Sequence, residues 1–285
     1  MYATRVPIHG TTGGTTRGTL RATVRVVTFA AVAMTLSAQW LTYPTKGLPL
    51  KADGSPDLTA PAPKAANGKP DLSGVWDVEK NRPCGVTGCP DQAPQEYFNI
   101  GAALSGGLPY QPWAAALVKS RTAQNSVEDP VTRCLPIGVV HTHTLPLLRK
   151  IVQTPDLLVI FYERNASYRQ IFTDGRSLPE DPQPSYNGYS TGKWEGDTLV
   201  VQSNGFQDGL WLDHNGSPLT EAAKMTERFR RPNVGRLEVE ITVDDPKAYT
   251  RPWTVKLNQI LVPNAELLDA YCLENEKDIQ HFVNH

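Results

Sequence analysis

The second half of the chain, from Lys150 to Cys272, reads as one short β-strand after another, each ended by a turn signal. Runs rich in Val, Ile, Tyr and Phe alternate with Gly, Pro, Asn and Asp, which is typical of antiparallel strands joined by tight turns. We expect strands at 73–78, 149–153, 157–163, 168–173, 186–194, 197–203, 224–231, 236–243, 253–261 and 267–272. This spacing predicts an all-β antiparallel meander that forms a barrel or a sandwich.

One helix is predicted outside this run, at about residues 111–125. Pro112 occupies a position that the first turn of a helix tolerates, and strong helix formers follow it. We expect Trp113, Leu117 and Ala116 to form a buried stripe that packs on the β-domain. The helix belongs to a loop-rich insertion at 84–148, and no second domain boundary is visible in 73–285.

The N-terminal segment, residues 1–38, has the composition of a secretory signal peptide. It contains four arginines and no acidic residue, followed by an apolar stretch from Val26 to Ala38. Thirteen residues at about 1.5 Å each are too few to span a bilayer, but they fit the apolar core of a signal peptide. The alternative is a buried helix of the mature fold. The signal predicts a periplasmic or secreted protein with no integral membrane segment after cleavage.

The charge of the mature chain excludes some partners. Without the four N-terminal arginines, the 28 basic side chains fall to 24 against 29 acidic ones, a net charge of −5. Nucleic acids and anionic membranes attract basic surfaces, so neither is expected as a partner. The short basic cluster of Arg228, Arg230 and Arg231 is interpreted as a solvated strand face. Oligomeric state cannot be read from the sequence.

Residues 39–72 are expected to form a linker, because six prolines recur there among Gly, Ala, Asp and Lys. Such a composition buries too little apolar surface to fold alone. The segment is therefore either an extended tether or a strap lying on the surface of the β-domain.

The four cysteines agree with export, because disulfides persist in oxidising compartments. Cys84 and Cys89 flank a loop with two glycines that makes a local bridge easy, and Cys134–Cys272 would then join the start of the β-region to its end. Three pairings are open to four cysteines. A zinc site is the competing interpretation, but the C-x4-C spacing differs from the usual C-x2-C and no histidine lies nearby in sequence.

Strand alternation carries one carboxylate into the expected core. Met225, Glu227 and Phe229 lie on one face of the strand 224–231, so an inward Met225 and Phe229 bring Glu227 with them. A buried carboxylate must be paired or neutralised, and Arg169 on an earlier strand is its expected partner. The two residues form a structural ion pair, a ligand anchor, or a catalytic pair with Glu227 as acid/base and Arg169 as charge stabiliser.

Aromatic side chains and loop residues are the other candidates. A barrel of about eight strands can enclose one ligand. Its expected aromatic walls are Trp76, Tyr162, Tyr168, Tyr189, Trp194 and Trp253. In the loop 204–223, Trp211 and Asp213 are further ligand-binding candidates, and Asp213 beside His214 is either a base with its orienting group or a plain turn.

His141 and His143 have the most metal-like spacing in the chain. On a strand, both imidazoles would face one side, but no third ligand is visible. An exposed polar strand is the preferred interpretation, and no metal is predicted. No phosphate-binding loop, Gly-x-Ser-x-Gly or His-Glu-x-x-His motif occurs, so the sequence indicates no cofactor.

Six motifs occur in an order that resembles a family of secreted bacterial proteins from acidobacteria and related groups. They are Gly-Lys-Pro-Asp-Leu-Ser-Gly-Val-Trp (68–76), Arg-Cys-Leu-Pro (133–136), Lys-Ile-Val-Gln-Thr-Pro (150–155), Tyr-Arg-Gln-Ile-Phe-Thr-Asp-Gly-Arg (168–176), Gly-Lys-Trp-Glu-Gly-Asp-Thr-Leu-Val-Val (192–201) and Thr-Glu-Arg-Phe-Arg-Arg (226–231). The resemblance covers nearly all of residues 68–278. It implies a compartment and an architecture, and no mechanism.

A second resemblance is to lipocalin-like calycins. Gly74-Val75-Trp76 is similar to the Gly-x-Trp at the start of their first strand, whereas the long insertion that follows departs from their pattern. This resemblance implies a barrel more than it implies lipid carriage.

Three functions follow from these observations. The first is a periplasmic or secreted β-barrel that binds a small, largely apolar ligand. The second is a cofactor-independent isomerase, hydratase or lyase that uses Glu227 and Arg169. The third is a structural or interaction module of the cell envelope.

Overall fold

The computed structural model describes residues 43–80 and 94–272. The strands are β1 (Gly74–Val78), β2 (Arg149–Gln153), β3 (Leu157–Tyr162), β4 (Ser167–Phe172), β5 (Tyr189–Glu195), β6 (Thr198–Asn204), β7 (Leu210–Trp211), β8 (Pro218–Leu219), β9 (Lys224–Asn233), β10 (Arg236–Asp244), β11 (Trp253–Lys256) and β12 (Gln259–Leu261). The helices are α1 (Gln95–Phe98), α2 (Pro112–Ala123) and α3 (Val139–Thr144).

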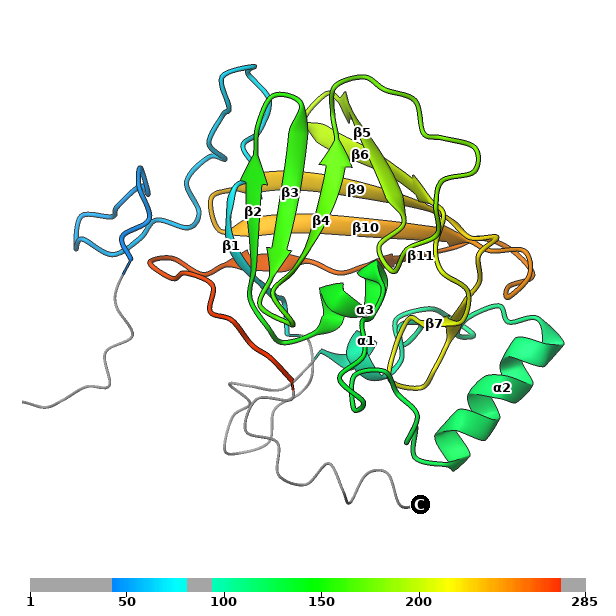
Figure 1. Cartoon of the computed structure of the whole chain (residues 1–285). Helices are drawn as coiled ribbons and strands as arrows, with labels where there is room; N and C mark the ends of the chain where they lie inside the picture. Colours follow the sequence, from blue (N-terminus) through cyan, green and yellow to red (C-terminus); the bar gives the residue numbers. More distant parts are fainter. Residues whose placement is uncertain (1–42, 81–93, 273–285) are drawn as a thin grey trace, which may run out of the picture. The chain divides into compact units, whose positions relative to one another are not determined.

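Nine strands close into a barrel (Figure 1). Their order is β10-β12-β1-β2-β3-β4-β5-β6-β9, and β9 pairs with β10 to complete the circle, while β11 extends the edge of β10 beside β12. The strands follow one another in the barrel almost as they do in the chain. The predicted all-β meander is therefore confirmed, as a barrel rather than a sandwich.

One pair of neighbouring strands in this barrel is parallel. In a closed ring of nine strands, directions cannot alternate all the way round, so at least one pair must be parallel. That pair is β4 and β5, and it is joined at a single position, Phe172 with Thr191. We call this β4–β5 junction the seam of the barrel. Main-chain pairing is weak there, whereas β3–β4 and β5–β6 have six and seven paired positions.

Alternate side chains of the strands fill the interior, as the period of two requires. On β9 and β10 the inward positions hold Met225, Phe229, Val239 and Ile241, all nearly without solvent exposure. Glu227 lies between them and is equally buried, with Val201 and Ile241 as its cross-strand neighbours. The expectation that alternation carries Glu227 into the core is confirmed.

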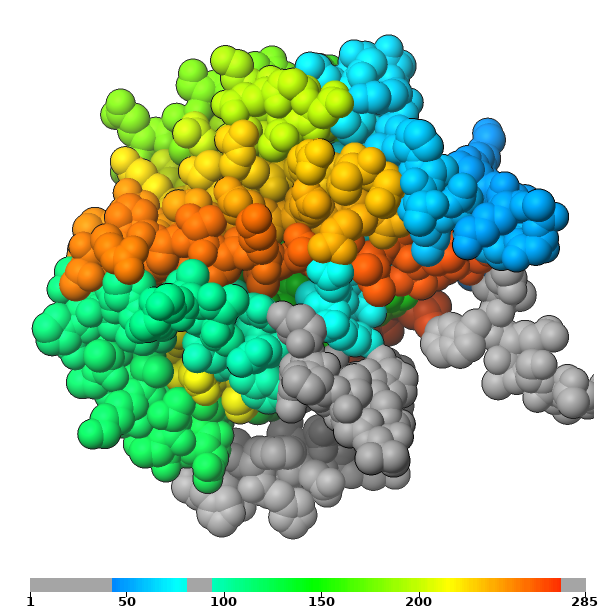
Figure 2. Space-filling view, turned by 180° about the vertical axis from the view of Figure 1, so that it is seen from behind, coloured from blue at the N-terminus to red at the C-terminus, as the bar shows by residue number. Residues whose placement is uncertain are grey.

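The Pro-rich segment before β1 lies on the barrel as a strap. Main-chain hydrogen bonds from Val234 and Gly235 to the carbonyls of Ala60 and Leu58 attach it to the β9–β10 turn. Figure 2 shows the strap beside the β9–β10 hairpin. Arg231 faces inward, unlike Arg228 and Arg230, and donates hydrogen bonds to carbonyls at the start of β1, so the expected common solvated face of the three arginines is wrong for Arg231.

The helices differ from expectation in their packing. The predicted helix at 111–125 is present as α2, but only Ala114 is buried and Trp113 is 47% exposed, so the predicted buried stripe is wrong. Instead of packing on strands, α2 is held by hydrogen bonds to loops. The indole of Trp113 donates to the carbonyl of Lys247, and the guanidinium of Arg121 donates to the carbonyl of Gly216. Residues 267–272, expected as a strand, form only an isolated bridge at Ala270.

Two predictions fall on parts of the chain that lie outside the described residues. These are the signal segment at 1–38 and the Cys84–Cys89 bridge. Within 43–80 and 94–272, no helix has the length and apolar character needed to cross a bilayer.

Candidate functional site

A fully buried ion pair lies inside the barrel, between Arg169 on β4 and Glu227 on β9. Nη1 of Arg169 donates to Oε1 of Glu227 at 3.0 Å, and Nη2 donates to Oε2. This two-point contact matches the planar fork of a guanidinium to a carboxylate. The partner predicted for Glu227 from the strand pattern is therefore the one observed.

Two serines extend the ion pair into a network across the parallel seam. Arg169 also donates to Oγ of Ser190 on β5 at 3.0 Å and to Oγ of Ser203 on β6 at 3.0 Å, and the two hydroxyls lie 2.8 Å apart. The network joins β4, β5, β6 and β9. It links side chains across the place where β4 and β5 share one backbone pairing.

The ion pair keeps Glu227 charged. Burial alone would raise the pKa of this carboxyl, but the Arg169 guanidinium and His143 lower the pKa to about 2. A carboxylate held in this way is a poor proton acceptor and does not serve as an acid near neutral pH. A role of Glu227 as a catalytic acid/base stays a prediction, and the negative charge that this carboxylate keeps near neutral pH disfavours it.

Helix α3 lies across one end of the barrel, near β3 and β4 (Figure 1), and all six of its residues are buried. Nε2 of His143 lies 3.3 Å from Oε1 of Glu227, but its alignment does not make a hydrogen bond. Arg149 of β2 holds the helix end by donating to the carbonyls of His143, Leu145 and Leu147. The segment expected as an exposed polar strand is thus a buried helix of six residues, with Gly138 and Leu145 as its flanking residues.

Several polar atoms around α3 have no hydrogen-bond partner among the described residues. They are both ring nitrogens of His141 and His143, the hydroxyl of Tyr162 and Nε of Arg149. Burial lowers the pKa of His141 to about 4 and raises that of Tyr162 to about 12, so both are neutral at pH 7. Unsatisfied buried polar atoms each cost about 1–3 kcal/mol, and their concentration at one end of the barrel marks this end as the candidate site.

A second polar group lies on the other side of α3. His141 is 5.4 Å from the ring of Tyr97, which stacks on His214 at 5.9 Å. Nδ1 of His214 lies 2.6 Å from Oδ2 of Asp129, whose carboxylate is fully buried. These residues come from α1, the loop after α2, α3 and the loop between β7 and β8.

Asp213 does not pair with His214, although the two are sequence neighbours. Its carboxylate accepts hydrogen bonds from the amides of Ile100 and Ser217 and from the Ser217 hydroxyl. It therefore holds the loop in place, while Asp129 orients the imidazole. Of the two interpretations of Asp213 beside His214, the turn is the one observed for Asp213, because the β7–β8 turn points the two side chains to different partners.

The Cys134–Cys272 disulfide is present and fixes the loop that carries Asp129. Arg164 supports the same loop by donating to the carbonyls of Val131 and Leu135. Closing a loop of this length stabilises the folded state by about 4–5 kcal/mol in chain-entropy estimates. The bridge predicted from the cysteine positions is confirmed.

The aromatic candidates do not gather in one place. Trp76 and Trp253 are buried in the core, and Trp211 is buried beneath Arg121. Tyr168 is 58% exposed on the outer face, since Arg169 beside it faces inward, so its expected place on the interior wall is wrong. Tyr189 accepts a hydrogen bond from Arg176, and Trp194 lines an outer hollow of about 640 Å³ beside the seam.

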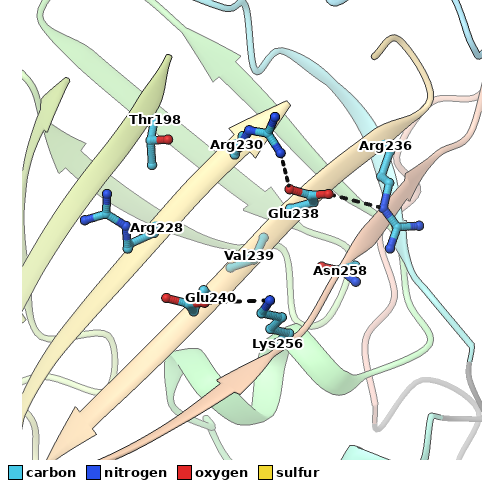
Figure 3. A pocket seen from close by; sticks show the side chains of 9 residues that line it. All are labelled: Thr198, Arg228, Arg230, Arg236, Glu238, Val239, Glu240, Lys256 and Asn258. Carbon is cyan, nitrogen blue, oxygen red and sulfur yellow. Dashed lines mark hydrogen bonds and ion pairs between the residues drawn. The ribbon is translucent and has the colours of Figure 1, made fainter. Parts of the chain in front are cut away.

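Hollows on the outside of the barrel do not contain the ion pair. Figure 3 shows one of about 300 Å³ over β9 and β10, where Arg230 and Arg236 pair with Glu238 and Lys256 pairs with Glu240. Its charges are matched across neighbouring strands. It therefore has the character of a solvated strand face, as expected for Arg228 and Arg230.

Metal binding finds no support in the part of the chain that the structure describes. No group of three or more His, Cys, Asp or Glu side chains there has the geometry to hold a metal ion. His141 and His143 point to opposite sides of α3, toward Tyr97 and Phe229 respectively, so they do not share a ligand.

Comparison with known families adds no assignment. No protein-family model matches the chain, and a comparison with curated proteins finds no relative.

The buried histidines predict a loss of stability in mild acid. The lowered pKa of His141 means that the unfolded chain binds a proton between about pH 6.5 and pH 4 while the folded chain does not, so the free energy of unfolding falls with pH in this window. We expect a fall of about 2 kcal/mol from pH 7 to pH 5 due to His141 alone. Glu227, with its lowered pKa, adds a loss only between about pH 4.5 and pH 2.

Urea unfolding of the wild type and of His141→Leu at pH 7 and pH 5 measures this effect. His141→Leu should flatten the dependence between these two pH values. An equal slope in the two proteins would show that His141 is not buried in its neutral form.

Proposed function

We propose that this protein binds a small, largely apolar molecule with an anionic head group at the α3 end of its barrel. The observation that carries the proposal is the set of buried polar atoms without partners, which surrounds α3 and includes all four ring nitrogens of its two histidines. A helix that merely closed the barrel would be more stable with apolar side chains at these positions.

The charges of the site support an anionic head group. Arg149 and Arg169 are both fully buried at this end, and Glu227 is the carboxylate that pairs with Arg169. Arg149 donates only to main-chain carbonyls among the described residues, and its Nε has no partner. A ligand carboxylate near Arg149, Tyr162 and His143 would supply both the missing charge and the missing hydrogen bonds.

The interior supplies the apolar contact. Phe229 lies 6.2 Å from His143, and buried side chains of β3, β4 and β6 continue the apolar wall. No solvent reaches Glu227 or Arg169, so a ligand enters this region only when α3 moves. That helix has six residues and no side-chain cap.

The alternatives account for less of the site. A structural module explains the Arg169–Glu227 network and Nε2 of His143, which lies 3.3 Å from Oε1 of Glu227, but it gives no role to Nδ1 of His143 or the hydroxyl of Tyr162. An isomerase, hydratase or lyase based on Glu227 requires a proton acceptor, whereas the lowered pKa of this carboxyl makes it a weak one. Binding is therefore the function that the geometry of the interior supports best.

We also propose that the protein is exported to the periplasm or secreted, as a calycin-like member of the acidobacterial family that its motifs resemble. The arginine-rich start, the apolar stretch to Ala38 and the Cys134–Cys272 disulfide support this. N-terminal sequencing of the protein from a periplasmic fraction should give a chain that begins at Gln39. An uncleaved chain in the cytoplasm would contradict export.

Two buried tyrosines provide a matched test of ligand binding. The hydroxyl of Tyr162 has no partner, whereas that of Tyr249 donates to the carbonyl of Pro218 at 2.8 Å. We expect Tyr162→Phe to leave the free energy of unfolding unchanged or raised and to weaken decanoate binding about tenfold, the equivalent of one hydrogen bond. Tyr249→Phe should lose about 1 kcal/mol of stability and keep its affinity.

Calorimetric titration with decanoate and with 1-decanol measures these affinities. Decanoate should bind more tightly than the alcohol because of the buried guanidinium groups. Absence of decanoate binding, or equal affinities in wild type and Tyr162→Phe, would contradict the proposed site.

A further inference from the structure

We propose that His214, oriented by Asp129, is a general base that activates water for the hydrolysis of small, uncharged aryl esters. This inference is independent of the ligand proposed for the barrel interior. It rests on the Asp129–His214 pair outside α3, which the binding function does not use.

The pair has the geometry of a catalytic base and its orienting carboxylate. Nδ1 of His214 lies 2.6 Å from Oδ2 of Asp129, and Oδ1 of Asp129 is fixed by the amide of Val131 at 2.8 Å. The carboxylate therefore accepts the Nδ1 proton and leaves the lone pair of the neutral ring on Nε2. Asp129 is fully buried while the His214 side chain is 28% exposed, so the imidazole is partly open to solvent.

The surrounding chain holds the imidazole in one position. The amides of His214 and Asn215 donate to the carbonyls of Tyr97 and Phe98 at the end of α1. Asp213 fixes the rest of the turn, and the Cys134–Cys272 disulfide holds the Asp129 loop. A base whose orientation is set before substrate binds loses little entropy on reaction.

A second, independent feature points to the same place. His141 is fully buried, both of its ring nitrogens lack partners among the described residues, and its ring is 5.4 Å from Tyr97. Because burial keeps this histidine neutral, it carries one N–H, which has no acceptor among the described residues. The ring of Tyr97 thus contacts both the partly exposed imidazole of His214 and the fully buried imidazole of His141.

The residues define the reaction. Among the described residues, the aromatic and hydrogen-bonding partners of the His214 ring are the side chains of Tyr97, Phe98 and Asp129, and none of these is a serine, cysteine or lysine nucleophile. Water is therefore the nucleophile in the proposed reaction. Nε2 takes a proton from water, the resulting hydroxide adds to the ester carbonyl carbon, and the tetrahedral intermediate expels the aryloxide, which recovers the proton from the imidazolium.

The substrate class follows from the walls of the site. Two aromatic rings flank the imidazole, one stacked and one edge-on, and they favour a planar aryl group. The nearby arginine, Arg164, is buried and donates to main-chain carbonyls, so the site offers no exposed cation from its described residues for a charged substrate.

Hydrolysis of p-nitrophenyl acetate by the full chain tests the proposal. His214→Gln should reduce the rate about a hundredfold or more, the range that positioned general bases contribute. Asp129→Asn should reduce it similarly, because its amide donates to Nδ1 and forces the ring proton onto Nε2. Asp174→Asn, which alters an exposed ion pair far along the chain, should retain the wild-type rate.

Two further measurements keep the test independent of folding defects. The wild-type rate should be slower in heavy water, because the base removes a proton from water in the reaction. Nitrogen NMR should place the His214 ring proton on Nδ1 in wild type and on Nε2 in Asp129→Asn. Wild-type and His214→Gln rates within twofold of each other, or no isotope effect, would overturn the proposal.

Discussion

The buried network of Arg169, Glu227, Ser190 and Ser203 joins the strands of the barrel at the β4–β5 seam, where main-chain pairing is weakest. A nine-strand ring requires a parallel pair, and the β4–β5 pair that meets this requirement has a single paired position. The guanidinium on β4 bonds to side chains on β5, β6 and β9, so it replaces missing main-chain pairing with side-chain hydrogen bonds. A buried ion pair of this kind is neutral in net stability when intact and expensive when one partner is lost.

The α3 end of the barrel concentrates polar groups that the fold does not satisfy. His143 faces the ion pair and His141 faces Tyr97 and the Asp129–His214 pair, so one short helix separates two different chemical environments. The interior group has fixed charges and suits binding. The outer group has an orientable, partly exposed imidazole and suits proton transfer. The outer group depends on the loops that the disulfide and the β7–β8 turn hold in place.

Strand alternation was enough to predict the barrel wall and its central ion pair. The period of two placed Glu227 inside, and the same period on β4 selected Arg169. The contacts of α3 and His214 were not predictable, because Asp129, Tyr97 and His214 lie up to 117 positions apart and come together only through loop packing. A signal was nevertheless present: Val139 to Thr144 lacks any charged residue, which is unusual for an exposed strand. The prediction that Trp113 is buried was wrong because its indole donates to a loop carbonyl while it stays exposed.

The free energy of unfolding of Glu227→Gln tests most directly whether the network closes the barrel. Loss of the carboxylate leaves the buried charge of Arg169 uncompensated, with only the hydroxyls of Ser190 and Ser203 as partners, and we expect a cost of about 3–5 kcal/mol. Glu240→Gln provides the control, because this exposed glutamate on the adjacent strand faces Lys256 at 4.0 Å and should contribute less than about 1 kcal/mol. Equal, small losses in the two variants would contradict the account.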